Sequence, residues 1–263
     1  MDAEQLDERV ASFLNWTYRF EFDNGVATPV ADTRRLNRQI QRRRYLFEPL
    51  LGLFGGTLSG QRVLDLGCGP GFWALQSIEA GADFVLGADR QKLRLDQARL
   101  VFEAAEVDPA RFELLERDVF ELEPKGFDVA LCIALFEETC RPAELFELIS
   151  SSGADVVLIE SELSRAADSY FELAKLPPRK ARGERSIALI PTREAIAELA
   201  GDFGYKTVAL ARTMSDYEGL EDYRTGRRLG FICARESALD TLDAEPARSH
   251  GLRAGLHRAL GRG

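Results

Sequence analysis

From residue 61 onward, short apolar runs alternate with stretches in which apolar residues recur at helical spacing. The runs predict strands at residues 62–66, 83–88, 112–116, 127–133, 155–160, 206–211 and 229–235. Helices are expected between several of them, at residues 72–80, 93–106 and 193–201. Strands that alternate with helices pair in parallel, because each crossover helix returns the chain to the same edge of the sheet. The pattern therefore predicts an α/β domain over residues 61–236, with a doubly wound, mostly parallel sheet of seven strands.

The segments on either side of this pattern have a different texture. Residues 1–60 predict a helical cap, with an aromatic cluster at Trp16, Tyr18 and Phe20 and an arginine-rich helix over residues 32–54. The aromatic side chains either close over a ligand or pack a helix against the sheet. Residues 163–186 are expected to form a long loop that carries specificity. Residues 237–263 are rich in alanine, arginine and glycine and predict a loose tail or a weak terminal helix.

Composition narrows the class of protein. The 263 residues carry a net charge of −9, which disfavours a surface that coats nucleic acid. Four well-separated cysteines and two histidines give no pattern for a metal site, so none is expected. No apolar run approaches the roughly 18 residues of a membrane-spanning helix, and the acidic N-terminus has no apolar leader. We therefore expect a cytoplasmic protein with no membrane partner.

The strongest chemical signal is the segment Val63-Leu64-Asp65-Leu66-Gly67-Cys68-Gly69-Pro70-Gly71, an apolar strand that enters a glycine turn before a helix. Glycines at such a turn let a ligand approach the backbone, and ligands of open α/β sheets bind at the carboxyl ends of the strands. A dinucleotide site would place a third glycine where Phe72 stands, and the bulky pair Phe72-Trp73 argues against a pyrophosphate cradle. The turn therefore predicts a ligand site and argues against a dinucleotide as the ligand.

A carboxylate follows the glycine turn at the end of the next predicted strand. Asp89 ends the second predicted strand, about 20 residues beyond the glycines. A carboxylate at this place can accept hydrogen bonds from both hydroxyls of a ribose, and it can also cap the next helix. We expect both roles for Asp89.

This unit resembles motif I of the class I S-adenosylmethionine (AdoMet)-dependent methyltransferases, of which Gly-Cys-Gly-x-Gly is a specific form. The resemblance covers roughly residues 40–235. The stretch from Gly71 to Arg99, with Asn24-Gly25 and Ile190-Pro191-Thr192, is similar to a branch that includes tRNA wobble-uridine (carboxy)methyltransferases and small-molecule or natural-product methyltransferases. The resemblance implies a Rossmann-like fold, and it implies AdoMet or a modified AdoMet as the methyl donor.

The resemblance also implies a set of cofactor-binding positions. An aspartate after the third strand, here Asp118, would accept from the adenine amino group, and the backbone N–H of Val119 would donate to the ring. The expected cofactor-binding residues are Asp65, Gly67, Cys68, Gly69, Gly71, Phe72, Asp89, Arg90, Asp118, Val119 and Ile133.

One departure from this branch concerns the chemistry. Relatives commonly have a Tyr-His pair after the fourth strand, where this chain has Glu137-Glu138. Both histidines, His250 and His257, lie in the tail, so no histidine is expected to act. A hydroxyl acceptor needs its proton removed, and Glu137 and Glu138 are the candidate catalytic carboxylates, with Glu160 a weaker one.

The sequence favours an oxygen or nitrogen of a small molecule as the methyl acceptor. The arginines at 34–44 raise the alternative of a tRNA substrate, since contacts to phosphate dominate such affinity, but they also fit a helix face paired with acidic side chains. A third alternative is an AdoMet-binding pseudoenzyme that serves as the partner subunit of an active enzyme. The oligomeric state is not predicted.

Overall fold

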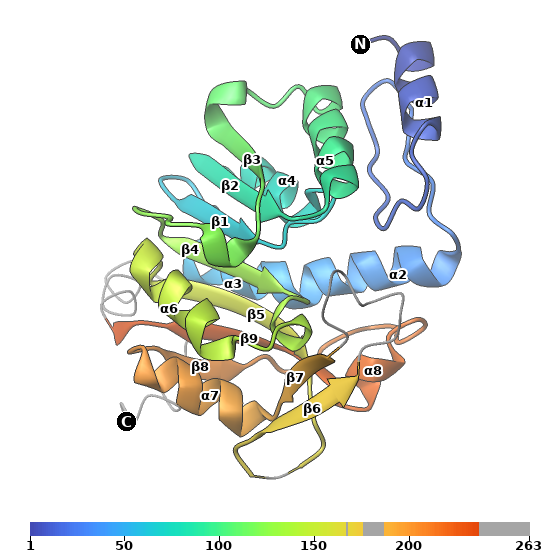
Figure 1. The fold of residues 1–263 in the computed structure, drawn as a ribbon. Helices are drawn as coiled ribbons and strands as arrows, with labels where there is room; N and C mark the ends of the chain where they lie inside the picture. The colour runs from blue at the N-terminus through green and yellow to red at the C-terminus, as the bar shows by residue number, and fades with distance from the viewer. Residues whose placement is uncertain (167, 176–186, 237–263) are drawn as a thin grey trace.

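The computed structural model describes residues 1–166, 168–175 and 187–236. Its main sheet has seven strands in the order β3-β2-β1-β4-β5-β9-β8. The strands are β1 Arg62–Leu66, β2 Phe84–Asp89, β3 Phe112–Glu116, β4 Val129–Ile133, β5 Val156–Glu162, β8 Lys206–Ala209 and β9 Arg228–Ala234. The first five pair in parallel, and β9 is antiparallel to both β5 and β8. This confirms the prediction of a doubly wound, mostly parallel seven-stranded α/β fold (Figure 1).

Helices cover both faces of the sheet because its central strands are apolar on both sides. Val63 and Val129 face one hydrophobic cluster, and their neighbours Leu64 and Ala130 face the other. The first cluster holds α3 Glu48–Leu53, α4 Phe72–Glu79 and α5 Lys92–Ala104, and the second holds α6 Pro142–Ser152 and α7 Arg193–Asp202. Short helices complete the chain: η2 Pro109–Arg111, η3 Val119–Glu121, η4 Phe136–Glu138 and α8 Glu221–Arg224.

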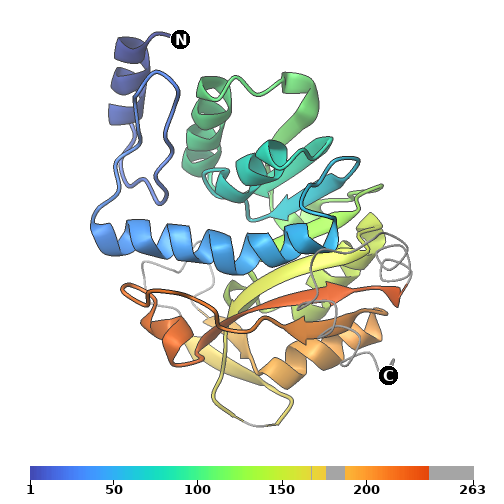
Figure 2. The same cartoon turned by 180° about the vertical axis from the view of Figure 1, so that it is seen from behind.

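The N-terminal segment packs into the first of these two clusters. Its helices are α1 Ala3–Ala11 and α2 Thr33–Arg42, and α2 continues through the π-helical turn η1 Arg43–Phe47 into α3. Figure 2 shows this long, light-blue helix lying across one face of the sheet. The helix expected over residues 32–54 is therefore present. Trp16 and Phe20 are buried in the same cluster, so these two aromatic side chains pack the segment against the domain.

The prediction of a long loop over residues 163–186 is wrong in part. Residues Phe171–Lys175 form β6, which pairs antiparallel with β7 Ile187–Pro191 in a separate two-stranded sheet. Phe171 and Leu173 lie on the same face of β6, but Phe171 is partly buried whereas Leu173 is 66% exposed. The strand therefore lacks the regular alternation of apolar and polar residues that marks a half-buried strand. Pairing with β7 decides its structure. The expected tail, 237–263, with both histidines, lies outside the described residues.

The arginine-rich face of α2 is paired with acidic side chains from distant parts of the chain. Arg34 forms an ion pair with Glu221, Arg38 with Asp222 and Arg42 with Glu160, at 2.6, 2.7 and 2.8 Å. Asn37 and Arg38 also donate to the carbonyls of Glu218 and Gly219. This geometry agrees with the interpretation of the arginines as a paired helix face.

Candidate cofactor and acceptor site

A cavity of about 630 Å³ lies where the carboxyl ends of β1, β2 and β4 meet the N-terminal segment. This is the edge at which open α/β sheets bind their ligands. The residues that line it include eight of the eleven expected cofactor-binding positions: Gly67, Cys68, Gly69, Asp89, Arg90, Asp118, Val119 and Ile133. The topology therefore brings together residues that are up to 66 positions apart in the sequence.

The glycine turn after β1 has a backbone that favours glycine. Gly67, Gly69 and Gly71 have φ values of 73°, 55° and 79°, in the left-handed region. A Cβ on Gly69 would meet nothing within 4 Å and would point into open space at the cavity, whereas a Cβ on Gly71 would lie 3.1 Å from Ala98 and from the ring of Phe102. Gly69 thus keeps the backbone open to a ligand, and Gly71 lets α5 pack closely.

Asp89 links the glycine turn to the end of β2. Its Oδ2 accepts from the backbone N–H of Gly69 at 3.0 Å, and its Oδ1 accepts from the N–H of Gln91 at 2.8 Å. Each carboxylate oxygen has a second lone pair, so both remain able to accept a further hydrogen bond. Asp89 is 6% exposed and borders the cavity. The carboxylate is held in one orientation with acceptor capacity left for two hydroxyls, as a ribose requires.

Asp118 lies at the neighbouring edge, after β3. Its Oδ1 accepts from the N–H of Phe120 at 3.1 Å and caps the short helix η3. Val119 and Ile133 are buried apolar residues that border the same cavity. An apolar surface beside a carboxylate suits a purine ring with an exocyclic amine.

Two buried polar atoms close to this edge have no partner among the described residues. They are the Oδ2 of Asp65, an acceptor, and the indole Nε1–H of Trp73, a donor. Burial, assisted by the charge of Asp89 and opposed by a backbone hydrogen bond from Ala74, raises the pKa of the Asp65 carboxyl to about 7. An amino-acid group presents an ammonium donor and a carboxylate acceptor. One unpartnered acceptor and one unpartnered donor therefore fit the methionine end of AdoMet.

Three expected cofactor-binding residues and one expected catalytic residue do not border the cavity. Asp65 is 1% exposed beneath the turn, and Gly71 packs against α5. Phe72 stacks on Tyr18 with ring centroids 4.4 Å apart and planes 9° apart. Glu137 is 1% exposed, and its Oε1 accepts from Arg228 at 2.6 Å.

Tyr18 and Arg42 border the cavity, and sequence reasoning did not assign them to the cofactor site. Arg42 donates to the hydroxyl of Tyr18 at 3.1 Å and lies over the ring of Trp73, 5.5 Å from its centroid. The same guanidinium makes two 2.8 Å hydrogen bonds to Glu160. Both residues come from the N-terminal segment, so only their position in space connects them to the glycine turn. The aromatic cluster was the one available signal, and it left Tyr18 ambiguous.

The segment after β4 forms the wall opposite the glycine turn. Ala134 has a φ of 59°, which is strained for a residue with a side chain, and its N–H donates to the carbonyl of Glu160 at 2.9 Å. This bend directs Leu135 toward Gly67, where a Cβ would lie 3.4 Å from the Leu135 side chain. Glu138, Thr139 and Cys140 then border the cavity together with Ile187 of β7.

Behind this wall lies a buried ionic network. Arg228 donates to Glu137, Glu160 and Asp222, at 2.6, 3.2 and 3.1 Å, and Arg42 pairs with the same Glu160. Burial alone would raise the pKa of Glu160, but the two guanidinium groups hold that pKa below its usual value. A carboxylate that stays charged between two arginines is a poor proton acceptor. The network therefore gives Glu160 a structural role.

Within the described ranges, no group of three histidine, cysteine, aspartate or glutamate side chains is arranged to hold a metal ion. No helix in the same ranges is both long and apolar enough to cross a membrane.

The glycine turn, the capped Asp89 and the sheet order agree with the resemblance to class I AdoMet-dependent methyltransferases. Residues 63–153 match a family model described as "Methyltransferase domain". The cofactor of this class is AdoMet.

Known proteins similar to the chain are named as methyltransferases. A ubiquinone biosynthesis O-methyltransferase of Neisseria meningitidis is 33% identical over 118 residues, 44% of this chain and 50% of that protein. A tRNA U34 carboxymethyltransferase of Geobacter is 28% identical over 195 residues, 72% of this chain and 57% of that protein. The chain thus matches only about half the length of these relatives.

Solved structures share the fold at low sequence identity. The N-terminal domain of EvdMO1, crystallised in the presence of S-adenosylhomocysteine (SAH) and D-fucose, has a TM-score of 0.67 and 18% identity. The match covers 89% of this chain and 97% of that one. Magnesium protoporphyrin IX methyltransferase from Synechocystis, with bound AdoMet, has a TM-score of 0.53 and 17% identity, over 79% and 86% of the two chains.

Proposed function

We propose that this protein transfers a methyl group from AdoMet to an oxygen or nitrogen of a small-molecule acceptor. The observation that carries the proposal is the orientation of Asp89, whose two oxygens are fixed by backbone N–H groups beside the open glycine turn. A pre-oriented carboxylate at a strand end suits a ribose, and the neighbouring unpartnered atoms suit an amino acid.

In this proposal different residues of the site hold different parts of the cofactor. Asp89 accepts from the ribose hydroxyls, Asp118 and the N–H of Val119 hold the adenine, and Gly67 and Gly69 let the backbone approach. Trp73, which borders the cavity, donates its indole N–H to the carboxylate of the methionine end. When bound, the cofactor supplies a methyl group already activated by the sulfonium. The chain then has to hold the acceptor in line, and such positioning lowers a barrier by about 7–11 kcal/mol.

Glu138 is the carboxylate that we propose acts on the acceptor. It borders the cavity beside Ala134 and Leu135, in the segment that faces Gly67. A hydroxyl acceptor loses its proton as the methyl group arrives, and a carboxylate at this wall receives or orients that proton. Glu137, the other candidate, points into the network with Arg228.

Calorimetry with AdoMet and SAH tests the proposal directly. We expect Asp89→Ala to weaken cofactor binding by about 10-fold to 150-fold, because hydrogen bonds to a charged group contribute about 1.5–3 kcal/mol. The matched control is Asp202→Ala, since Asp202 is exposed at the end of α7, and it should bind as the unmodified protein does. Binding of NAD with no binding of AdoMet would overturn the assignment.

The tRNA-modifying relatives support a second candidate, because one of them aligns with 72% of this chain. Against it stands the pairing of Arg34, Arg38 and Arg42 with carboxylates, which leaves those arginines already neutralised. A protein cation binds nucleic acid by neutralising a phosphate, which releases the counterions condensed there. An arginine that is already paired with a carboxylate contributes less to this effect. A small acceptor that enters the cavity is therefore favoured.

We accordingly predict that bulk tRNA shows no strong, salt-dependent binding. Titrations between about 50 and 200 mM salt should change the affinity by less than about tenfold. Arg43→Glu with Arg44→Glu, both exposed, tests the helix without disturbing the buried Arg42, and Arg165→Glu with Arg193→Glu is the matched control. A loss of about 10³-fold or more across that salt range, abolished by the Arg43 and Arg44 changes alone, would favour the tRNA substrate.

The pseudoenzyme alternative makes a different prediction. A chain of this kind would bind AdoMet and show no turnover with any acceptor unless an active partner were present. Tracing a labelled methyl group in host extracts, separated into RNA and small-molecule fractions, distinguishes the three functions in one experiment.

A further inference from the structure

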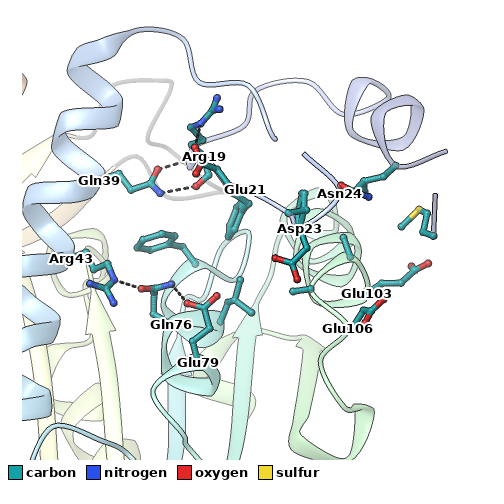
Figure 3. Close-up of a pocket in the computed structure, with 18 of the residues that line it drawn as sticks. Arg19, Glu21, Asp23, Asn24, Gln39, Arg43, Gln76, Glu79, Glu103 and Glu106 are labelled. Carbon is teal, nitrogen blue, oxygen red and sulfur yellow. Dashed lines mark hydrogen bonds and ion pairs between the residues drawn. The ribbon is translucent and has the colours of Figure 1, made fainter. Parts of the chain in front are cut away.

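A second cavity, of about 700 Å³, is lined by Phe72, whose ring stacks on Tyr18 of the cofactor cavity. Figure 3 shows this second cavity in close-up. It is bounded by the turn at residues 20–24, the middle of α2, the length of α4 and the end of α5. Its apolar surface includes the buried side chains of Phe20, Phe22, Phe72 and Leu75, and Ile40 is 41% exposed beside them. Phe72 meets the cofactor site through its stack on Tyr18, and the other four residues do not border that site.

The rim of this cavity is strongly acidic. Its charged residues are the carboxylates Glu21, Asp23, Glu79, Glu103 and Glu106 and the cations Arg19 and Arg43. Asp23 and Glu106 form no ion pair with any side chain of the described ranges. Figure 3 shows Asp23, Glu103 and Glu106 gathered along one side of the cavity, away from Arg19 and Arg43. An apolar floor beside unpaired carboxylates fits a ligand that is both apolar and cationic.

The chain itself contains a segment with this chemistry. Residues 246–263 hold four arginines and no acidic residue, so the chain's net charge of −9 leaves −13 on residues 1–245. Leu252, Leu256 and Leu260 recur every fourth residue, the spacing that places side chains on one face of a helix. Four glycines in the segment lower its intrinsic helix propensity, so a helix here would depend on a surface to pack against.

The segment is long enough to reach the cavity. β9 ends beside the start of β5, where the N–H of Arg235 donates to the carbonyl of Asp155. The helices α4 and α5 end toward this same edge of the sheet, because each returns the chain to the start of the next parallel strand. Four strand spacings, about 19 Å, separate β9 from β2, and a helix layer adds about 10 Å. The nine residues 237–245 ahead of the segment span up to about 30 Å when extended.

We propose that residues 246–263 bind in this second cavity, with the leucines on the apolar floor and the arginines at Asp23 and Glu106. The segment would then brace Phe72 against Tyr18, the wall that the two cavities share. The proposal does not depend on the identity of the acceptor or on turnover.

Disulfide trapping in the full chain tests this contact. Leu256→Cys is combined with Ile40→Cys, in the cavity, and separately with Leu93→Cys, which is 48% exposed at the start of α5 and does not border the cavity. Under mild oxidation we expect the disulfide between positions 40 and 256 to form at least tenfold faster than the control, within one chain and independently of protein concentration. Mass spectrometry of the linked peptides identifies the pair. Equal rates for the two pairs, or links only between two chains, would overturn the proposal.

Charge exchange provides a second measurement. Asp23→Lys with Glu106→Lys should slow the disulfide between positions 40 and 256 by about tenfold or more, and adding Arg253→Glu and Arg258→Glu should restore its rate. Restoration requires the rim and the segment to meet, whereas a general loss of folding would not be reversed by changes in the segment. Unchanged rates in the rim variant, or no restoration, would contradict the proposed pairing.

Discussion

Glu138→Gln is expected to lower kcat for methyl transfer to a hydroxyl acceptor by about 10²–10⁴, with almost no change in cofactor affinity. The reason is position: Glu138 borders the cavity in the segment that bends at Ala134 toward the glycine turn. Glutamine keeps the size and polarity of the side chain but cannot take up a proton. Single-turnover rates with saturating AdoMet, together with calorimetry on the same variant, separate chemistry from binding.

The neighbouring Glu137 gives a matched control for this result. Glu137→Gln removes the same charge from a side chain that is 1% exposed and bound to Arg228, so we expect it to affect stability more than kcat. A loss in kcat below about tenfold for Glu138→Gln would show that the acceptor needs no base from this wall, as for an amine that arrives neutral. A large kcat loss confined to Glu137→Gln would return the catalytic role to that residue.

The second large effect concerns the buried ionic network. Arg228→Met should lower the free energy of unfolding by about 3–5 kcal/mol, because removing one partner of a buried ion pair leaves an uncompensated charge. Arg228 is the only cation that pairs with Glu137 in the described structure, and Glu137 already has one buried oxygen without a partner. Urea unfolding followed by circular dichroism measures the change.

Two companion variants make the stability result interpretable. Arg227→Met removes the adjacent arginine, which is half exposed and pairs with Glu162, and should cost no more than about 1 kcal/mol. Arg228→Met combined with Glu137→Gln should recover part of the loss, since the stranded charge is gone while Glu160 keeps Arg42. Equal losses for Arg227→Met and Arg228→Met would mean that the network contributes nothing specific.

Local pattern was sufficient for the sheet and for the glycine turn. Strands such as β1 and β4 are continuous apolar runs because both of their faces are covered by helices, so their signal needs no knowledge of the rest of the chain. The spacing alone predicted that Asp89 lies beside the glycine turn. Asp89 ends the neighbouring strand, and parallel strands bring their carboxyl ends to one edge of the sheet.

The sequence did not distinguish Glu137 from Glu138, and it did not connect Tyr18 or Arg42 to the cofactor site. Adjacent residues in the 3₁₀ turn η4 point in different directions, and only the packing of β9 against β5 brings Arg228 to Glu137. β6 and β7 were missed for a similar reason, because each is short and is stabilised by pairing with the other.

By itself, then, the sequence determined the seven strands of the main sheet and the glycine turn with Asp89 at the neighbouring strand end. These features depend on contacts within one βα unit or between neighbouring strand ends. The tertiary structure alone decided which carboxylate faces the cavity, which arginines are already neutralised, and that the N-terminal segment supplies one wall of the site. Such assignments depend on pairs like Arg42 with Glu160, 118 residues apart, whose meeting is fixed by the packed fold and leaves no periodic trace in the chain.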